Sequence, residues 1–293
     1  MKKHLQVFLV CALVSLACCV TACTSLFFYP QKKLVRTPAA VGLEYEDIWL
    51  ETSDGVVLHG WRLPAIGKPW ATVVHFHGNA ENISTHLASV YWLPAEGVEV
   101  FLFDYRGYGM SEGVSELEGL HTDVVESVEY VARLKRGTSQ CIIVYGQSLG
   151  GSVALTALAS TPLRDELSAI VVESAFSDYR KIARDKLDNF WLTWLFKMPL
   201  SLTINNEFSP IEAIEKLNPT PILLIHGKHD PVVPFYHAKL LYEAAGVPKL
   251  LWQTESMGHS DAFSKTKYRR SFIDYLNSMC HLTSAVLPEG AAS

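Results

Sequence analysis

The chain has 293 residues, of which 49% are hydrophobic and 19% are charged, with 25 Lys and Arg against 30 Asp and Glu. This length is enough for one large domain or two small domains with a sizeable core. The formal net charge of -5 gives no basic surface, so we expect no nucleic-acid partner. The hydrophobic content excludes a disordered chain and predicts a folded globular protein.

The N-terminus has the pattern of a targeting segment. Lys2 and Lys3 precede a run from Leu5 to Gln31 that contains no charged residue. A basic start, an apolar run and small residues before a cleavage point are typical of a secretory signal. The run is also long enough for an uncleaved membrane anchor. The sequence Val20-Thr21-Ala22-Cys23 resembles the bacterial lipobox, which favours the first interpretation.

The lipobox resemblance implies a signal peptide over residues 1–22, lipidation of Cys23 and a tether over residues 23–44. It places the protein in the bacterial cell envelope, held to a membrane through its lipid. Thr24 rather than Asp follows Cys23, which favours the outer membrane or periplasmic face. Cys141 and Cys280 would then remain unmodified. Two cysteines are not a disulfide framework, and Cys141 opens an apolar strand, so we interpret it as a buried free thiol.

Strand patterns begin after the tether. Two runs, Tyr45–Thr52 and Val56–Leu63, flank the turn Ser53-Asp54-Gly55 and predict an antiparallel hairpin. Continuous apolar runs follow, as expected for strands buried on both faces of a sheet. These runs are Thr72–Phe76, Val98–Phe103, Cys141–Tyr145, Ala169–Val172, Ile222–Ile225 and Leu250–Trp252.

Helical patterns lie between these runs. Apolar residues recur at helical spacing from Leu120 to Leu134, and Ser209–Glu212 reads as a capping box with Pro210 at the first helical position. The alternation predicts an α/β fold with a mostly parallel sheet and helices on both faces. We expect one domain over residues 45–282 and a flexible tail over 283–293.

A candidate nucleophile lies at the end of a predicted strand. The sequence Gly146-Gln147-Ser148-Leu149-Gly150 follows the run Cys141–Tyr145 and precedes a helical pattern over Val153–Ala159. This is a G-x-S-x-G motif in the strand-turn-helix setting that the motif requires. We predict that Ser148 is a catalytic nucleophile.

A serine nucleophile needs a general base and a carboxylate that orients the base. His259 lies between the last predicted strand and the C-terminal helix, whereas His86 is interpreted as facing solvent on a helix. Asp230 follows the run that ends at Ile225. The chain order Ser148, Asp230, His259 is one of three known triad orders.

Other carboxylates compete for the role of the acid. Glu173 and Asp178 follow the strand that ends at Val172, which is an alternative position for the acid. Asp261 is too close to His259 in sequence to orient its ring easily. Asp104 is better explained as holding a loop.

Acyl transfer also needs donors for the developing oxyanion. The backbone N–H of Leu149, after the nucleophile, is one candidate. The loop His77–Asn82 offers the other, because Gly78 lets the backbone turn inward and present the N–H of Asn79. The pair His75-x-His77 suggests a metal site instead, but no further ligands with suitable spacing accompany it. We therefore predict no metal and no cofactor.

These motifs together resemble the alpha/beta-hydrolase superfamily, and within it the serine aminopeptidase-like and acyl-protein thioesterase-like branch. They are His-Gly-Asn-Ala, Asp-Tyr-Arg-Gly-Tyr-Gly, Gly-Gln-Ser-Leu-Gly-Gly, His-Gly-x-x-Asp-x-Val-Val-Pro and Gly-His, spread in order over about residues 45–280. The resemblance implies an eight-stranded, mostly parallel sheet and a Ser-Asp-His triad. It also implies hydrolysis of esters, thioesters or amides without a cofactor.

The segment from about 185 to 208 interrupts the alternation with an aromatic stretch that contains Trp191 and Trp194 and a helix that Pro199 would end. We interpret it as a small helical cap that selects apolar acyl groups, because ligands gather at the carboxyl ends of the strands. Ordinary core packing is the alternative.

The sequence as a whole predicts a lipid-anchored serine hydrolase that acts on a small-molecule or acylated substrate through an acyl-enzyme. An acyltransferase would use the same residues. A non-catalytic binding or scaffold protein on a hydrolase fold is a further alternative, although such proteins are expected to lose a triad member.

Overall fold

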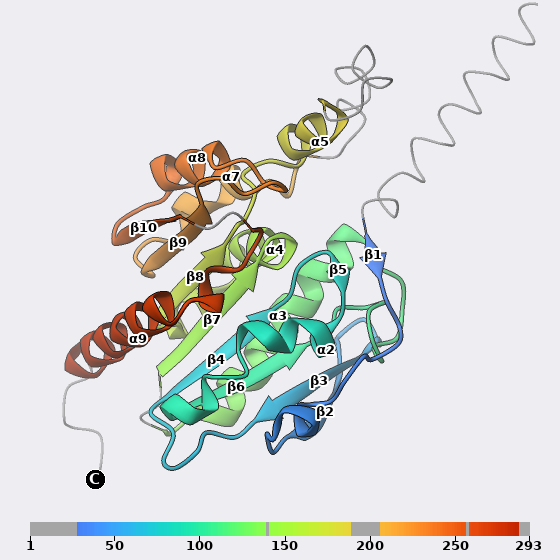
Figure 1. The fold of residues 1–293 in the computed structure, drawn as a ribbon, viewed down its shortest axis with the longest axis vertical. Helices are drawn as coiled ribbons and strands as arrows, with labels where there is room; N and C mark the ends of the chain where they lie inside the picture. The colour runs from blue at the N-terminus through green and yellow to red at the C-terminus, as the bar shows by residue number, and fades with distance from the viewer. Residues whose placement is uncertain (1–27, 139–140, 189–205, 256–257, 287–293) are drawn as a thin grey trace, which may run out of the picture.

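The computed structural model describes residues 28–138, 141–188, 206–255 and 258–286. Eight strands form one sheet in the order β10-β9-β8-β7-β4-β6-β3-β2 (Figure 1). Strands β10 to β6 pair in parallel in that order, and β3 pairs antiparallel with both β6 and β2. The strands are β2 (Glu46–Glu51), β3 (Val57–Leu63), β4 (Ala71–Phe76), β6 (Val98–Phe103), β7 (Cys141–Gln147), β8 (Ala169–Glu173), β9 (Ile222–Gly227) and β10 (Lys249–Thr254). The predicted mostly parallel, eight-stranded sheet is confirmed.

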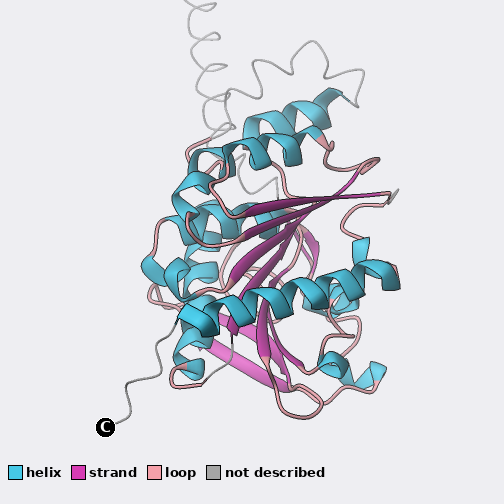
Figure 2. Cartoon of the chain, turned by 90° about the vertical axis from the view of Figure 1, so that its left-hand side faces the viewer, coloured by secondary structure: helices cyan, strands magenta, loops and turns pink. Residues whose placement is uncertain are grey.

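Helices cover both faces of the sheet, as Figure 2 shows. Helices α3, α4, α7 and α8 contribute to the core on one face, and α2 and α9 contribute to the core on the other. The helices are α2 (Ile83–His86), α3 (Leu117–Lys135), α4 (Leu149–Ala159), α5 (Tyr179–Asp188), α7 (Pro210–Ala213), α8 (Tyr236–Ala244) and α9 (Thr266–Val286). Short 3-10 turns are η2 (Pro38–Val41), η3 (Leu87–Ser89), η4 (Pro94–Glu96), η5 (Pro162–Glu166), η7 (Ile214–Leu217) and η8 (Ala262–Ser264).

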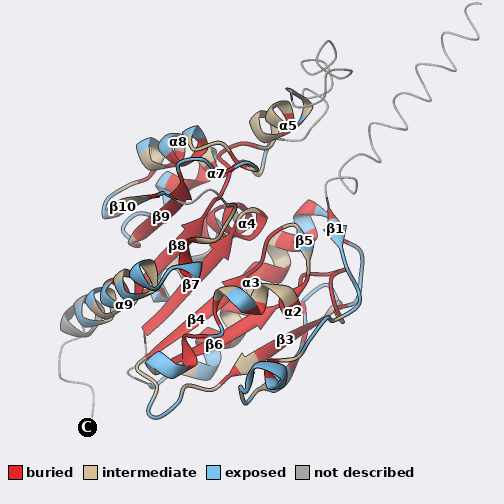
Figure 3. Ribbon diagram, in the orientation of Figure 1, coloured by how far each residue is buried: buried red, intermediate tan, exposed pale blue. Residues whose placement is uncertain are grey.

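Burial explains the two kinds of strand pattern in the sequence. Every residue of β4, β6, β7, β8 and β9 is buried, because helices pack on both sides of these strands (Figure 3). Strand β2 lies at the edge and alternates, with Ile48 and Leu50 buried and Trp49 53% exposed. Most continuous apolar runs of the sequence therefore mark the central strands, and the alternating run marks the edge strand β2. The prediction that Leu250–Trp252 is buried on both faces is wrong, because β10 lies at the other edge of the sheet and Leu250 is 48% exposed.

Helix α7 begins at Pro210 as predicted, but its capping box does not form. The Ser209 hydroxyl donates to Asn206 Oδ1 at 2.8 Å and accepts from the Tyr179 backbone N–H at 3.2 Å. It therefore makes no side-chain cap bond to its own helix. The hydroxyl instead connects the start of α7 to the start of α5.

Several predicted segments lie partly or wholly outside the described residues. The signal peptide (1–22) and Cys23 lie outside them. Of the predicted cap, residues 185–188 lie in α5, whereas Trp191 and Trp194 lie outside the described part. Helix α9 continues to Val286, past the predicted domain end at 282. Within the described residues, no helix is long and apolar enough to cross a membrane.

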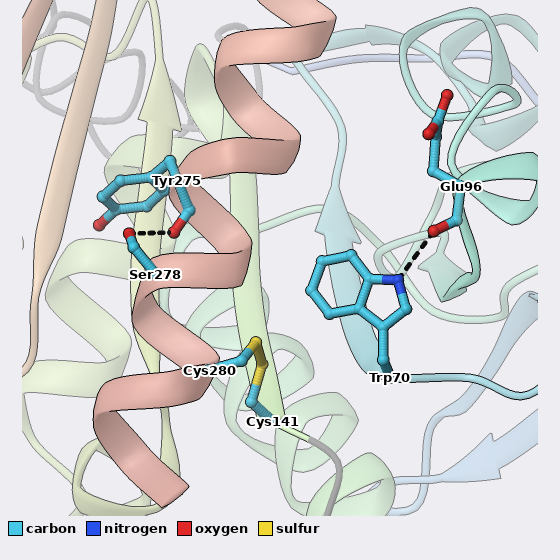
Figure 4. Close-up of a disulfide and its surroundings, with 6 residues drawn as sticks. All are labelled: Trp70, Glu96, Cys141, Tyr275, Ser278 and Cys280. Carbon is cyan, nitrogen blue, oxygen red and sulfur yellow. Dashed lines mark hydrogen bonds between the residues drawn. A yellow bond between two sulfur atoms is a disulfide. The ribbon is translucent and has the colours of Figure 1, made fainter. Parts of the chain in front are cut away.

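The prediction of a free buried thiol at Cys141 is wrong. Cys141, at the start of β7, forms a disulfide with Cys280 of α9, with Cα atoms 5.4 Å apart (Figure 4). The two residues are 139 positions apart in sequence, so no local spacing indicated the pair. The bond joins the strand that leads to Ser148 to the helix that follows the His259 loop.

We predict that breaking this disulfide destabilises the fold without altering its topology. Crosslinking a loop of this length restricts the unfolded chain, and its loss costs about 2–5 kcal/mol. A reductant should therefore lower the Tm of the wild-type protein, measured by circular dichroism, by several degrees. Cys280 is half-buried. The Cys280→Ser variant should have a lower Tm than the oxidised wild type even without reductant, and reductant should not change its Tm. A wild-type Tm that does not respond to reductant would contradict this prediction.

Candidate active site

Ser148 lies in a strained turn between β7 and α4. Its backbone has φ 51° and ψ −116°, a conformation that non-glycine residues rarely adopt. The Ser148 N–H donates to the carbonyl of Glu173, at the end of β8, at 2.8 Å. The residue is half-buried, so its side chain is held at the carboxyl edge of the sheet, as in a nucleophile elbow.

Close backbone contacts explain the glycines of the motif. A β-carbon on Gly146 would lie 2.5 Å from Gly151 Cα, and one on Gly150 would lie 2.4 Å from the carbonyl oxygen of His77. Neither distance leaves room for a side chain. The turn can pack against β4 and α4 only if both positions are glycine.

His259 and Asp230 form a direct pair. His259 Nδ1 lies 2.8 Å from one carboxylate oxygen of Asp230 and 3.1 Å from the other. Asp230 also accepts the backbone N–H groups of Val232 and Val233 at 2.8 and 2.9 Å. Burial raises the pKa of Asp230, but the hydrogen bond and charge of His259 outweigh it, so the pKa lies below its usual value. The carboxylate is therefore ionised and fixes the orientation of the imidazole.

A buried carboxylate, Glu173, holds the His259 loop against the elbow. Its Oε1 accepts the Ala262 N–H at 2.8 Å, and its Oε2 accepts from Gln147 at 2.9 Å and from the Tyr145 hydroxyl. The Gln147 amide also donates to the Ser260 carbonyl at 3.2 Å. These contacts bring the loop that carries His259 next to the residue before Ser148.

The rival acids have other partners. Glu173 is fully occupied by the contacts just described, and burial raises its pKa. Asp178 accepts from the Asn206 amide at 2.8 Å and from the Lys181 N–H at 2.8 Å. Neither carboxylate has a hydrogen bond to His259 within the described residues. Asp230 is therefore the carboxylate that the structure places on His259.

The predicted oxyanion loop follows β4 and is held by tyrosine hydroxyls. Tyr105 donates to the His77 carbonyl at 2.9 Å, and Tyr108 donates to the Asn79 carbonyl at 2.7 Å. His77 Nδ1 lies 2.7 Å from the Gly78 carbonyl oxygen. With three successive carbonyls bound, the peptide planes that carry the N–H groups of Gly78 and Asn79 are fixed. Leu149, the other predicted donor, is the first residue of α4, where helix amides favour negative charge.

Asp104 holds this loop, as predicted from the sequence. Its Oδ1 accepts the Ile83 N–H at 2.9 Å and lies 3.2 Å from His77 Nε2. A β-carbon on Gly109 would overlap the Asp104 carboxylate. The motif Asp-Tyr-Arg-Gly-Tyr-Gly therefore supports the predicted oxyanion loop.

The interpretation of His86 as a solvated residue holds only in part, because its side chain is half-buried. A β-carbon on Gly78 would lie 3.5 Å from His86 Cε1 and 3.6 Å from Ser148 Cβ, so His86 lines the site. Its ring stacks on His77 with centroids 5.2 Å apart. Burial and the neighbouring His77 lower the pKa of His86 to about 4, so its imidazole is neutral at neutral pH. The helical pattern of this short segment concealed its position.

His75 and His77 have separate partners. His75 Nε2 lies 3.2 Å from the Gln147 amide oxygen, and His77 pairs with Asp104. Within the described residues, no group of three or more His, Cys, Asp or Glu side chains could hold a metal ion.

A second Ser-His-Asp set is present and was not anticipated from the sequence. Ser177 Oγ lies 2.8 Å from His237 Nδ1, and His237 Nε2 lies 2.9 Å from Asp185 Oδ2. Ser177 and His237 are fully buried, so no substrate reaches this hydroxyl. The set connects the loop after β8, helix α5 and helix α8, and we interpret it as structural.

Comparisons with known proteins agree with this geometry. The model of the family described as "Serine aminopeptidase, S33" matches residues 67–212. The uncharacterized protein YfhR of Salmonella typhi is 35% identical over 266 residues, which cover 85% of this chain and 86% of that protein. The alpha/beta hydrolase domain-containing protein WAV2 of Arabidopsis thaliana is 33% identical over 71% of this chain and 69% of its own.

Solved structures share the fold. An esterase of Pyrococcus furiosus has a TM-score of 0.67 at 22% identity, over 86% of this chain and 97% of that chain. The esterase domain of a Rhodothermus marinus protein has a TM-score of 0.54 at 18% identity, over 74% of this chain and 90% of that chain. At these identities the likeness concerns the fold alone. With the matched family model and the YfhR relatives, it follows that the chain belongs to the serine aminopeptidase S33 family of alpha/beta hydrolases.

Proposed function

We propose that the protein is a serine hydrolase that cleaves carboxylic ester or thioester bonds, with amide bonds open to the same chemistry. The observation that carries the proposal is the ionised Asp230 paired with His259 Nδ1, on a loop held against the strained Ser148 turn. Paired in this way, the imidazole presents Nε2 as the base.

In the proposed reaction, the Ser148 hydroxyl oxygen attacks the acyl carbon while His259 Nε2 takes its proton. The negative charge that develops on the acyl oxygen is stabilised by the N–H groups of Leu149 and Asn79. His259 then returns the proton to the leaving group, and an acyl-enzyme remains on Ser148. Water, deprotonated by His259, attacks the acyl-enzyme, and the acid leaves with Ser148 regenerated.

We propose apolar acyl groups as the preferred substrates, with Trp191 and Trp194 as pocket residues outside the described part of the chain.

We also propose that the mature protein is exported to the cell envelope and anchored through lipid on Cys23. The Cys141–Cys280 disulfide supports export, because disulfides persist in oxidising compartments.

We predict that Ser148→Ala loses ester hydrolysis while its circular dichroism spectrum and Tm stay close to wild type. Loss of a triad nucleophile lowers kcat by about three to six powers of ten. The matched control is Ser177→Ala, which removes the hydroxyl of the buried second set and should keep kcat within about twofold per folded molecule. The nucleophile assignment fails if Ser148→Ala retains more than a few per cent of the p-nitrophenyl butyrate activity.

Glu173→Gln tests how the His259 loop is held. The amide that replaces Oε2 would face two donors, Gln147 and Tyr145, and could accept from neither. We expect kcat to fall about tenfold or more with KM within about twofold, because the substrate pocket is untouched.

The matched control for Glu173→Gln is Asp178→Asn, which changes the other carboxylate after β8. It should lower thermal stability by about 1 kcal/mol, because the amide oxygen can still accept the Lys181 N–H but the amide nitrogen would face the Asn206 donor. It should leave kcat unchanged. If Asp178→Asn is the variant that loses kcat, the orienting acid has been misassigned.

Cys23→Ser should block lipidation and processing. Mass spectrometry of the membrane fraction should find wild-type protein beginning at a lipid-modified Cys23 and the variant still carrying residues 1–22. Cys19→Ser, which alters a cysteine just before the Val20–Cys23 motif, should be processed as wild type. An unprocessed wild-type N-terminus at Met1 would refute lipidation and favour a simple anchor.

A further inference from the structure

The first described residues pack against the hydrolase domain. Phe28 is buried in the core, and β1 (Tyr29–Pro30) pairs in parallel with β5 (Ala80–Glu81) in the predicted oxyanion loop. Figure 1 shows β1 beside β5 at one end of the described part of the molecule. We call residues 28–36 the N-terminal strap.

Polar contacts fix the strap to the loop that borders Ser148. The Asn82 amide donates to the carbonyls of Gln31 and Lys33, both at 2.9 Å, and the Val35 N–H donates to Ser84 Oγ at 2.9 Å. The Gly109 N–H donates to the Gln31 carbonyl, also at 2.9 Å. The same loop brings Gly78 next to Ser148. The chain that enters the domain is therefore attached to the edge where the proposed chemistry occurs.

Charge is distributed unevenly around the strap. The first 43 residues contain five of the 25 Lys and Arg and none of the 30 Asp and Glu. Lys32, Lys33 and Arg36 follow the uncharged run that ends at Gln31. Lys32 is bound to the Ser111 carbonyl at 2.7 Å, whereas Lys33 and Arg36 are exposed. Arg36 takes part in no ion pair with a described residue.

A groove beside the strap combines this cation with apolar walls. It has a volume of about 270 Å³ and is lined by Arg36, Val41, Leu87, Ala88 and Tyr91. Tyr29 and Val35 on the strap are also exposed, at 65% and 59%. Exposed aromatic and aliphatic side chains with adjacent Lys and Arg are typical of surfaces that meet lipid headgroups.

We propose that the strap and the groove are a docking face for a bilayer containing anionic phospholipid. Cys23 is five residues before Phe28, so a lipid there would lie within about 18 Å of the strap. An uncleaved anchor would end at the same place. If the protein is the hydrolase proposed above, its substrate class is then an acyl ester presented at the lipid surface.

Lysine acetylation tests the docking face without reference to activity. The full-length protein is reconstituted into vesicles of phosphatidylcholine, or of phosphatidylcholine and phosphatidylglycerol in equal parts. It is then treated with an N-hydroxysuccinimidyl acetate and analysed by mass spectrometry. Acetylation of Lys33 should be about fivefold slower in the anionic vesicles. Lys68 is the exposed control, because it precedes β4, whereas the loop that binds the strap follows β4. The acetylation rate of Lys68 should be the same in the two kinds of vesicle.

Kinetics test the substrate class. The double variant Lys33→Gln/Arg36→Gln should hydrolyse a long-chain p-nitrophenyl ester dissolved in anionic vesicles at least about fivefold more slowly than wild type. Its kcat/KM for soluble p-nitrophenyl butyrate should be unchanged, because neither residue borders Ser148. Lys68→Gln should match wild type on both substrates.

The outcomes separate this inference from the proposed function. Equal acetylation of Lys33 in the two kinds of vesicle would overturn the docking face, whatever the activity. A double variant with wild-type turnover of the vesicle-borne ester would overturn the substrate class. A wild-type protein that hydrolyses neither ester, but shows protected Lys33, would refute the hydrolase and leave the docking face supported.

Discussion

The parallel register of β7, β8 and β9 determines where Ser148, Glu173 and Asp230 lie. Gln147 is opposite Glu173, and Glu173 is opposite Ile225, so three strands end at nearly the same level. Ser148 directly follows β7, Glu173 is the last residue of β8, and the turn with Asp230 follows β9. A shift of one residue between β7 and β8 would move Glu173 to the other face of the sheet. It would also break the Ser148–Glu173 backbone bond and the contacts that hold the His259 loop.

Much of this arrangement could be predicted because it depends on local sequence. Strands with helices on both faces read as unbroken apolar runs, and each run in the chain corresponds to a strand within two residues at each end. The G-x-S-x-G motif needs its glycines for contacts of 2.4 and 2.5 Å that no side chain could allow. Such constraints act on neighbouring residues, so the sequence displays them directly.

The features that could not be predicted depend on contacts between distant residues. The cysteines of the disulfide are 139 positions apart, and their meeting depends on how α9 packs across β7. Glu173 could be seen as an acid near the site, but its role depends on Ala262, which lies 89 residues further along the chain. The position of His86 could not be predicted, because it depends on how its short helix packs next to Gly78. The strap pairs with β5 through two residues, too few to give a strand pattern.

The central claim is that Ser148, activated by His259 and Asp230, forms a covalent bond to substrate. The most direct measurement is to treat the full-length protein with a fluorophosphonate probe, digest it and locate the adduct by mass spectrometry. We expect one phosphonylated residue, Ser148, and no adduct on Ser177, whose buried hydroxyl has the same kind of partners. We also expect loss of labelling in His259→Ala. A protein that does not react, or an adduct on any other residue, would contradict the claim.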